Sequence, residues 1–334
     1  MTTYKKQSGP GKAYRRGLTD DQLTEMFSTE KKAEKWFQDH IWKGTPKCPQ
    51  CGSTNVNLKI KHPTMPYRCR ERECRKYFSI RTGTIMEDSK ISLRHWALTT
   101  HHYNTNLDGI SSMRLHRKLG ITQRSAWFML HRLRKASAPD KMKFEGTVEV
   151  DETFLGGKVR MMSNATKKRL KAEYGENLQG GKGKDILIGI KERETKQFQV
   201  DIIPDRKPET LKKFVLEHTI EGTTVITDEA DGYKGLDKLG RIHKSVNHSK
   251  KEWVKKDDRE VHIQGIESYW FTVKAGGLGA YRRVSKKHRL AYAWETTGKR
   301  NLREFDTLDQ MGALAYKMKG KRLKYRELTK GDQA

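Results

Sequence analysis

The chain has 334 residues, enough for two or three domains, and a net charge of +28 from 69 Lys and Arg against 41 Asp and Glu. Such a charge repels itself unless a polyanion offsets it, so the composition favours a nucleic-acid partner. The sequence contains no apolar run long enough to span a membrane, and its N-terminal region lacks the apolar core of a secretory signal. It has only four cysteines, too few for a disulfide scaffold.

The first segments of the chain are helical and cysteine-rich. Residues 1–17 are basic, and we expect a flexible arm there; residues 18–45 place apolar side chains at helical spacing and predict a short helical segment. Residues 46–82 contain a C-x2-C pair and a looser C-x4-C pair, which favour one tetrahedral zinc ion over four unrelated buried thiols. We therefore predict a zinc ribbon with one structural Zn²⁺. Its ligands would be Cys48, Cys51, Cys69 and Cys74.

Residues 90–136 predict three helices, the last two joined by a turn that contains glycine, as in a helix-turn-helix DNA-binding region. Thr122 would cap the last helix and leave Gln123 and Arg124 at its exposed N-terminal end, where such helices contact base edges. A generic basic helical bundle is the alternative. Residues 137–146 have the composition of a linker.

The periodicity changes at residue 147, where alternating apolar residues predict strands. The predicted order is strand, hairpin partner, strand, helix, strand, short strand and helix, which is the order of a ribonuclease-H-like mixed α/β domain. We place this catalytic domain at residues 147–302, with a long insertion at 158–184 and a basic C-terminal extension at 303–334. The expected fold class is therefore a multidomain α+β protein that combines zinc ribbon, helix-turn-helix region and mixed sheet.

Two of the predicted strands end in acids. The stretch VEVDETF leads into Asp151 and the stretch TTVITDEADGY into Asp228, while Glu267 lies on the following helix. Carboxylates that meet at one end of a sheet repel each other unless divalent cations neutralise them, and an all-oxygen ligand set suits Mg²⁺ or Mn²⁺. Two such ions promote phosphodiester chemistry. The alternative is that these are ordinary solvent-facing acids at strand ends.

Several blocks of the sequence together resemble the DDE transposases of bacterial insertion sequences, specifically the ISXO-two-like group. The resemblance covers roughly residues 20–302 and rests on VEVDETFLGGK, VITDEADGYKGL, VNHSKKEWV, VHIQGIESYWFTVKAGGLGAYRRVSKKH and YAWETTGKRN, with WKGTPKCPQCGS and YFSIRTGTIM upstream. By this resemblance Asp151 and Asp228 are the first two catalytic acids and metal ligands. The group commonly has Asn where this chain has Gln264.

We expect Glu267 to be the third acid, because a carboxylate holds Mg²⁺ better than an amide carbonyl. Gln264 lies three residues earlier on the same helix face and could assist. Lys274, two turns after Glu267, is an expected DNA contact, as are Arg282 and Arg283 in the basic stretch that follows. Trp270 could stack on a splayed nucleotide, but a core position is the favoured interpretation.

The predicted function is that of a DNA transposase. It would bind the terminal inverted repeats of its element, hydrolyse a strand at each end with water, and then use the exposed 3′-OH to attack target DNA. The expected partners are double-stranded DNA and at least one further copy of the chain, in the cytoplasm of a bacterium, associated with the nucleoid. Another ribonuclease-H-like nuclease or resolvase, or a domesticated DNA-binding regulator, are the alternatives.

Overall fold

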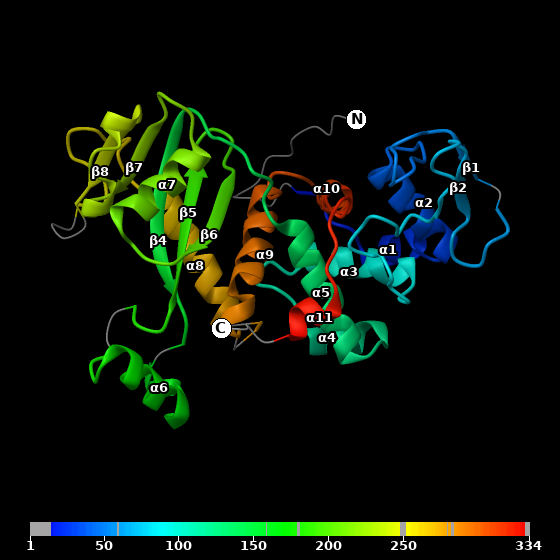
Figure 1. Cartoon of the computed structure of the whole chain (residues 1–334), viewed down its shortest axis with the longest axis horizontal. Helices are drawn as coiled ribbons and strands as arrows, with labels where there is room; N and C mark the ends of the chain where they lie inside the picture. The colour runs from blue at the N-terminus through cyan, green and yellow to red at the C-terminus, as the bar shows by residue number, and fades with distance from the viewer. Residues whose placement is uncertain are drawn as a thin grey trace. The chain divides into compact units, whose positions relative to one another are not determined.

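The computed structural model describes residues 15–58, 60–157, 159–178, 181–247, 252–278, 280–281 and 284–330. The chain divides into two compact units (Figure 1). The first joins Met1–Ala138 to Leu302–Ala334, and the second is Pro139–Asn301. In the described part of the chain no helix is both long and apolar enough to cross a membrane.

The first unit is a set of helices around one apolar core, with a small antiparallel sheet. Its helices are α1 (Asp20–Met26), α2 (Glu30–Ile41), α3 (Leu93–Thr105), α4 (Ser112–Leu119), α5 (Gln123–Ser137), α10 (Thr307–Lys317) and α11 (Tyr325–Thr329). Its strands are β1 (Val56–Asn57), β2 (Tyr67–Cys69) and β3 (Tyr77–Phe78), in that order.

The C-terminal residues 303–334 of the sequence contribute to the core of this unit. Met311 and Leu314 of α10 are buried in the same cluster as Phe37 of α2 and Trp96 of α3. A side chain on Gly312 would come within 2.4 Å of the His40 ring, so α10 passes close to α2. The segment that we expected only as a basic extension is thus a structural part of the first unit.

The second unit is built on a five-stranded mixed sheet in the order β6-β5-β4-β7-β8. The strands are β4 (Thr147–Leu155), β5 (Asp185–Glu192), β6 (Phe198–Ile203), β7 (Thr224–Asp228) and β8 (Ile242–Val246). β4, β5 and β6 are antiparallel neighbours, whereas β4, β7 and β8 run parallel. This arrangement agrees with the strand order expected from the sequence.

Helices cover both faces of the sheet (Figure 1). Helix α7 (Pro208–His218) packs on the face that carries Val148 and Val150. Helices α8 (Gln264–Leu278) and α9 (Arg289–Asn301) pack on the opposite face, in one apolar cluster with residues of β5, β6, β7 and β8. Since side chains alternate along a strand, residues 149 and 151 of β4 point toward the face covered by α8 and α9.

The long segment between β4 and β5 contains a short 3-10 helix (Val159–Met161) and helix α6 (Asn164–Tyr174). The side chain of Ser163 accepts a hydrogen bond from the amide of Thr166 and so caps α6. Helix α6 lies beyond the ends of β4 and β5 (Figure 1). Arg289 of α9 donates to the carbonyl of Leu155 at 2.9 Å and to Asp185 at 3.0 Å, which ties the two ends of the segment together.

The expected linker, residues 137–146, is packed rather than free. Helix α5 extends to Ser137, one residue into it. Phe144 is buried in the core of the second unit, and its amide donates to the carbonyl of His218 at 2.7 Å. A buried aromatic side chain in this short stretch explains the difference, because it joins the sheet domain before the first strand begins.

Candidate active site and metal centres

The four cysteines of the chain lie together at one end of the small sheet. Their sulfur atoms are all within 4.8 Å of one another, with 3.6 Å between Cys48 and Cys74 and 3.6 Å between Cys51 and Cys69. Cys48 and Cys51 lie in a turn that Gly52 closes: Gly52 has a φ of +76°, and its amide donates to the carbonyl of Cys48. Cys69 ends β2, and Cys74 lies in the turn before β3.

This donor set fits a structural zinc ion. Four sulfur ligands within this distance can form the tetrahedron that zinc prefers, and they leave no position for a substrate. Burial and hydrogen bonds with the neighbouring thiols raise the pKa of Cys69. A bound Zn²⁺ would favour the thiolate forms and hold the two turns together.

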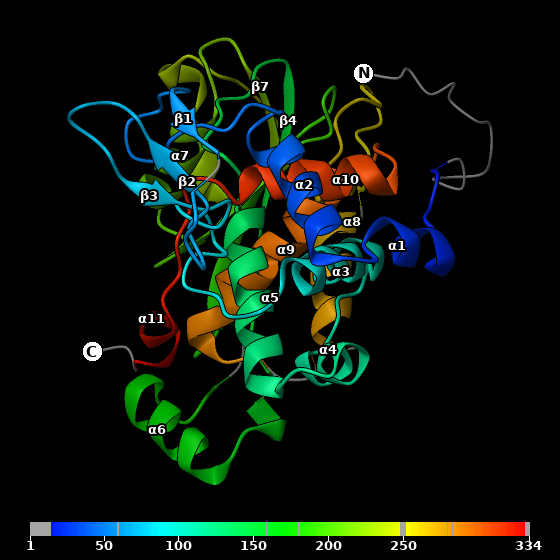
Figure 2. The ribbon, with the colours of Figure 1, turned by 90° about the vertical axis from the view of Figure 1, so that its right-hand side faces the viewer.

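The helices expected to read DNA are present as α4 and α5. Gly120 ends α4 with a φ of +64°, and the hydroxyl of Thr122 caps α5 by accepting from the amide of Ser125 at 3.1 Å. Gln123 and Arg124 are exposed at the start of α5. Figure 2 shows α4 beside one end of α5.

Both expected base-reading side chains already have partners within the first unit. The amide of Gln123 donates to Ser112 at 2.8 Å. The guanidinium of Arg124 lies 4.3 Å from the ring centre of Tyr325 in α11. A cation over an aromatic face is stabilised by the ring's quadrupole, so Tyr325 holds Arg124 in one orientation. Nothing in the local sequence of α5 indicated this partner, because it comes from the C-terminal end of the chain.

Asp151 and Asp228 lie on neighbouring parallel strands. The register pairs Glu149 of β4 with Ile226 of β7, and extending it by two residues sets Asp151 opposite Asp228. Oδ1 of Asp228 accepts the amide of Ala230 at 3.1 Å, which turns the chain away after the strand. The two aspartates that the sequence singled out are therefore close together, but only β7 ends in its aspartate as expected, because β4 continues past Asp151 to Leu155.

Trp270 fixes the orientation of Asp151. Its indole is only 4% exposed, and Nε1 donates to Oδ2 of Asp151 at 2.8 Å. Gly189 faces Asp151 across the β4–β5 ladder, and a side chain there would come within 2.7 Å of the indole. Glycine at this position thus gives the indole room to reach the carboxylate. Trp270 is a core residue, as favoured above, and also a direct partner of the site.

Asp151 is a buried carboxyl group that lies near other acids. Burial, followed by the charges of Glu152 and Asp228, raises its pKa to about 7, although the hydrogen bond from Trp270 opposes the rise. A divalent ion bound between these acids would reverse the effect of the like charges. The oxygen donors present fit Mg²⁺ or Mn²⁺.

Helix α8 carries the remaining candidate residues. Glu267 is half-buried in its first turn, three residues before Trp270 and therefore on the same side of the helix. Gln264 and Lys274 are exposed. Arg282 and Arg283 lie outside the described residues.

The second acids of the two Asp-Glu pairs occupy different surroundings. Glu152 points away from Trp270, toward the α7 face, where it binds Arg206 at 2.6 Å and accepts from the hydroxyl of Tyr233 at 2.6 Å. Glu229 is exposed in the turn after β7. Alternation along β4 separates Glu152 from Asp151, as expected for a strand.

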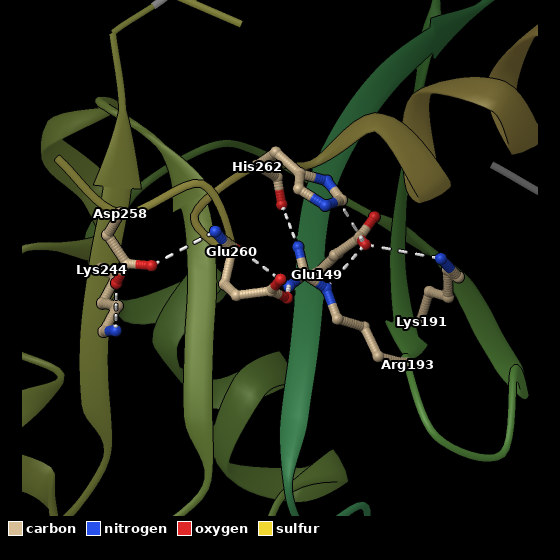
Figure 3. A network of polar contacts seen from close by, with 7 residues as sticks. All are labelled: Glu149, Lys191, Arg193, Lys244, Asp258, Glu260 and His262. Atoms are coloured by element: carbon tan, nitrogen blue, oxygen red, sulfur yellow. Dashed lines mark hydrogen bonds and ion pairs between the residues drawn. The ribbon is translucent and has the colours of Figure 1, made fainter. Parts of the chain in front are cut away.

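A buried carboxylate that the sequence analysis did not select joins the sheet to α8 (Figure 3). Glu149 is 0% exposed, and its Oε2 accepts the amide of Ile266 in the first turn of α8 at 2.9 Å. Its Oε1 accepts from Arg193 at 3.0 Å and lies 3.4 Å from the ammonium of Lys191. Glu149 thus connects the strand of Asp151 directly to the helix of Glu267.

Arg193 extends this connection to the segment that precedes α8 (Figure 3). Its Nη1 donates to the carbonyl of Glu260 at 2.6 Å, and its Nη2 donates to the carbonyl of His262 at 2.7 Å. One guanidinium therefore satisfies two loop carbonyls and the buried carboxylate, which fixes where α8 begins.

Comparison with known proteins agrees with this arrangement. Residues 143–301 match the ISXO2-like transposase domain, and residues 28–77 match the transposase zinc-ribbon domain, a range that includes all four cysteines. A protein encoded in the transposable element ISH50 of Halobacterium salinarum is 24% identical over 273 residues, which cover 80% of this chain and 89% of that protein.

The four-cysteine cluster and the mixed sheet that carries Asp151 and Asp228 lie in the regions matched by these two domains, so the chain has the domain composition of a transposase. More specifically, its sheet unit belongs to the ISXO2-like DDE transposase family and its N-terminal region to the zinc-ribbon family of transposases.

Proposed function

We propose that this transposase binds the terminal inverted repeats of its own insertion sequence and carries out metal-dependent strand cleavage and strand transfer. The observation that carries the proposal is the position of Asp151 and Asp228 on adjacent parallel strands, close enough that the charge of Asp228 acts on Asp151. The ribonuclease-H-like interpretation of the sheet and the helix-turn-helix interpretation of α4 and α5 belong to the same proposal.

Asp151, Asp228 and Glu267 would hold two divalent cations, with Gln264 assisting from the start of α8. When bound, these ions supply Lewis acidity and neutralise charge at the scissile phosphate. The protein's own part is positioning: Trp270 orients Asp151, and Glu149 sets the start of α8. Water, and later the 3′-OH, would attack the phosphorus atom, and the 3′ oxygen of the broken bond would leave, so no covalent protein–DNA intermediate is required.

DNA recognition would divide between the two units. Gln123 and Arg124 would contact base edges of the repeat, while Lys274 and the basic stretch with Arg282 and Arg283 would contact phosphates. Cleavage at two ends requires at least two copies of the chain on the DNA. The net charge of +28 supports a strong electrostatic contribution to this binding.

The test is a Mg²⁺-dependent nicking and strand-transfer assay on a labelled terminal repeat. Replacing Asp151, Asp228 or Glu267 by its amide should abolish cleavage and preserve DNA binding, since each change removes negative charge near a phosphate. Glu152→Gln and Glu229→Gln are the matched controls and should keep most activity. An active Asp228→Asn protein would rule out the mechanism.

The same assay separates Glu267 from Gln264 as third ligand. An active Glu267→Gln protein together with an inactive Gln264→Ala protein would assign the role to Gln264. Binding to the repeat without cleavage by the unmodified protein would instead favour a regulator, and cleavage without preference for the repeat would favour a general nuclease.

A further inference from the structure

An open cavity of about 540 Å³ lies at the start of α8. It is lined by Val254, Lys255, Lys256, Arg259, His262 and Gln264. The segment between β8 and α8 supplies most of this lining and is closed by an antiparallel bridge between Val254 and His262. The amide of Lys255 donates to the carbonyl of Val261 at 3.0 Å, which makes the segment a short hairpin.

The hairpin has equal numbers of basic and acidic residues, but it places them in different surroundings. Lys255 to Glu260 contains three cations and three acids. Asp258 binds Lys244 of β8 at 2.8 Å, and Glu260 lies 3.5 Å from Arg193 (Figure 3). These two acids are thus neutralised outside the cavity.

The cations, by contrast, line the cavity. Lys256 and Arg259 are exposed, and among the described residues neither forms an ion pair within 4.0 Å. Asp257 is exposed but does not line the cavity. The cavity therefore presents the positive charge of Lys256 and Arg259, which is the property of a site for an anion.

The site is fixed in position relative to the candidate catalytic residues. Arg193 holds the carbonyls of Glu260 and His262, and it binds Glu149 two residues before Asp151. Gln264 of the lining precedes Glu267 by three residues, roughly 4.5 Å along the helix axis. A DNA strand carries a phosphate every 3.4 Å or so of helix axis. The cavity therefore lies beside the first turn of the helix that carries Glu267, within a few phosphate spacings along a bound strand.

We propose that this cavity binds a backbone phosphate of the DNA strand beside the scissile phosphate, through Lys255, Lys256 and Arg259. The inference rests on the proposed function, since it takes DNA as the substrate of the neighbouring acids. Such a contact is independent of sequence: it sets the position of the strand over Asp151 and Asp228 and does not select the repeat.

The experiment measures binding of the full-length, zinc-loaded protein to a short labelled duplex of mixed sequence over a range of salt concentrations. The variant is Lys256→Ala with Arg259→Ala, two exposed residues whose loss leaves the Arg193 and Glu149 contacts in place. Its control is Lys212→Ala with Lys213→Ala on α7, which removes the same formal charge from the opposite face of the sheet. Cleavage of the terminal repeat is recorded for the same proteins.

We expect the slope of log affinity against log salt to decrease by about 1 in the Lys256/Arg259 variant, and less in the control. Equal slopes in the two variants, or a slope unchanged from the unmodified protein, would overturn the phosphate site. Failure of the unmodified protein to cleave the repeat would count against the proposed function, and it is read in a separate assay from the salt slope.

Discussion

The indole Nε1 of Trp270 donates a hydrogen bond of 2.8 Å to Oδ2 of Asp151, so a buried core residue of α8 directly controls a candidate metal ligand on β4. This bond favours the ionised form of Asp151, against burial and the neighbouring acids, which raise its pKa.

Trp270→Phe should therefore shift the pH dependence of cleavage upward. A hydrogen bond to a charged group contributes about 1.5 kcal/mol, and one pKa unit corresponds to about 1.4 kcal/mol. The acid limb of the rate profile at fixed Mg²⁺ should move up by about one unit. Trp294→Phe, on α9 in the same apolar cluster, is the control and should leave the limb in place. A uniform loss of rate at every pH would indicate a packing defect instead.

The raised pKa of Asp151 also predicts how stability depends on pH when magnesium and manganese are absent. Below about pH 4 the carboxyl group is protonated in both the folded and the unfolded chain and makes no difference. Between about pH 4 and pH 7 it ionises only in the unfolded chain, so stability decreases as pH rises. Above about pH 7 the carboxyl group is ionised in both states, and the loss of folding stability caused by its raised pKa stays at its full value.

Asp151→Asn should thus stabilise the second unit at pH 8, by on the order of 2 kcal/mol, and much less at pH 5. Hydrogen exchange of peptides from β4 and α8 measures this locally, with the zinc left bound. Asp201→Asn, at an exposed position of β6, is the control. A larger effect at pH 5 than at pH 8 would contradict the raised pKa, and added Mg²⁺ should remove the advantage.

The zinc site predicts a simple stoichiometry. Purified protein should contain one zinc per chain, and the double variant Cys48→Ser, Cys51→Ser should lose it, because two ligands cannot hold the ion. Ser53→Ala is a matched control: Ser53 lies beside the knuckle and bonds Glu71 at 2.6 Å without supplying a sulfur. Elemental analysis decides, and unchanged zinc in the double variant would refute the assignment.

The sequence was sufficient to predict features that depend on local pattern. Strand alternation predicted the strands that carry Asp151 and Asp228, and cysteine spacing predicted the four-cysteine cluster. It did not reveal Glu149, because an acid between Val148 and Val150 suggests a solvent-facing side chain. Here α8 and α9 cover that face as well, and Glu149 is buried with Arg193. Its role depends on a contact 117 residues away in the chain.

In the first unit, too, the sequence did not predict contacts between residues that are far apart in the chain. Helix propensity and the Thr122 cap predicted α5, but not that Tyr325 would lie on Arg124. Likewise, the basic composition of residues 303–334 did not indicate the apolar face with which α10 packs into the core. Contacts between distant segments depend on the whole packing arrangement, which no local periodicity encodes.

Arg124 should contribute specificity more than affinity. Arg124→Ala should weaken binding to the terminal repeat by about 1–3 kcal/mol more than binding to mixed-sequence DNA, as expected for a base contact. Arg117→Ala, an exposed arginine of α4, is the control and should weaken both equally. Competition binding at one salt concentration measures the difference. Equal weakening by Arg124→Ala would make it a phosphate contact.

Glu149 should act as a positioning residue for the candidate site. Its carboxylate accepts the amide of Ile266 at 2.9 Å and pairs with Arg193, so it sets the start of α8 and hence the place of Glu267. The amide of Glu149→Gln cannot accept all these hydrogen bonds, and the substitution removes the carboxylate with which both Lys191 and Arg193 pair. Since a displacement of about 1 Å can lower a rate about 10²-fold, we expect a fall of that size in cleavage at saturating DNA, with DNA affinity retained.

The matched control for this prediction is Glu192→Gln. Glu192 is a buried carboxylate at the end of β5 that accepts the amide of Glu145 at 3.1 Å, so its loss also disturbs the sheet, away from α8. Both variants are assayed well below their unfolding midpoints, and the Mg²⁺ dependence of the rate is measured for each. Glu149→Gln should need more Mg²⁺ for half-maximal rate, because the first turn of α8, which carries Glu267, is no longer fixed relative to β4, whereas Glu192→Gln should not. Equal losses in the two variants would mean that Glu149 serves general stability and does not position the site.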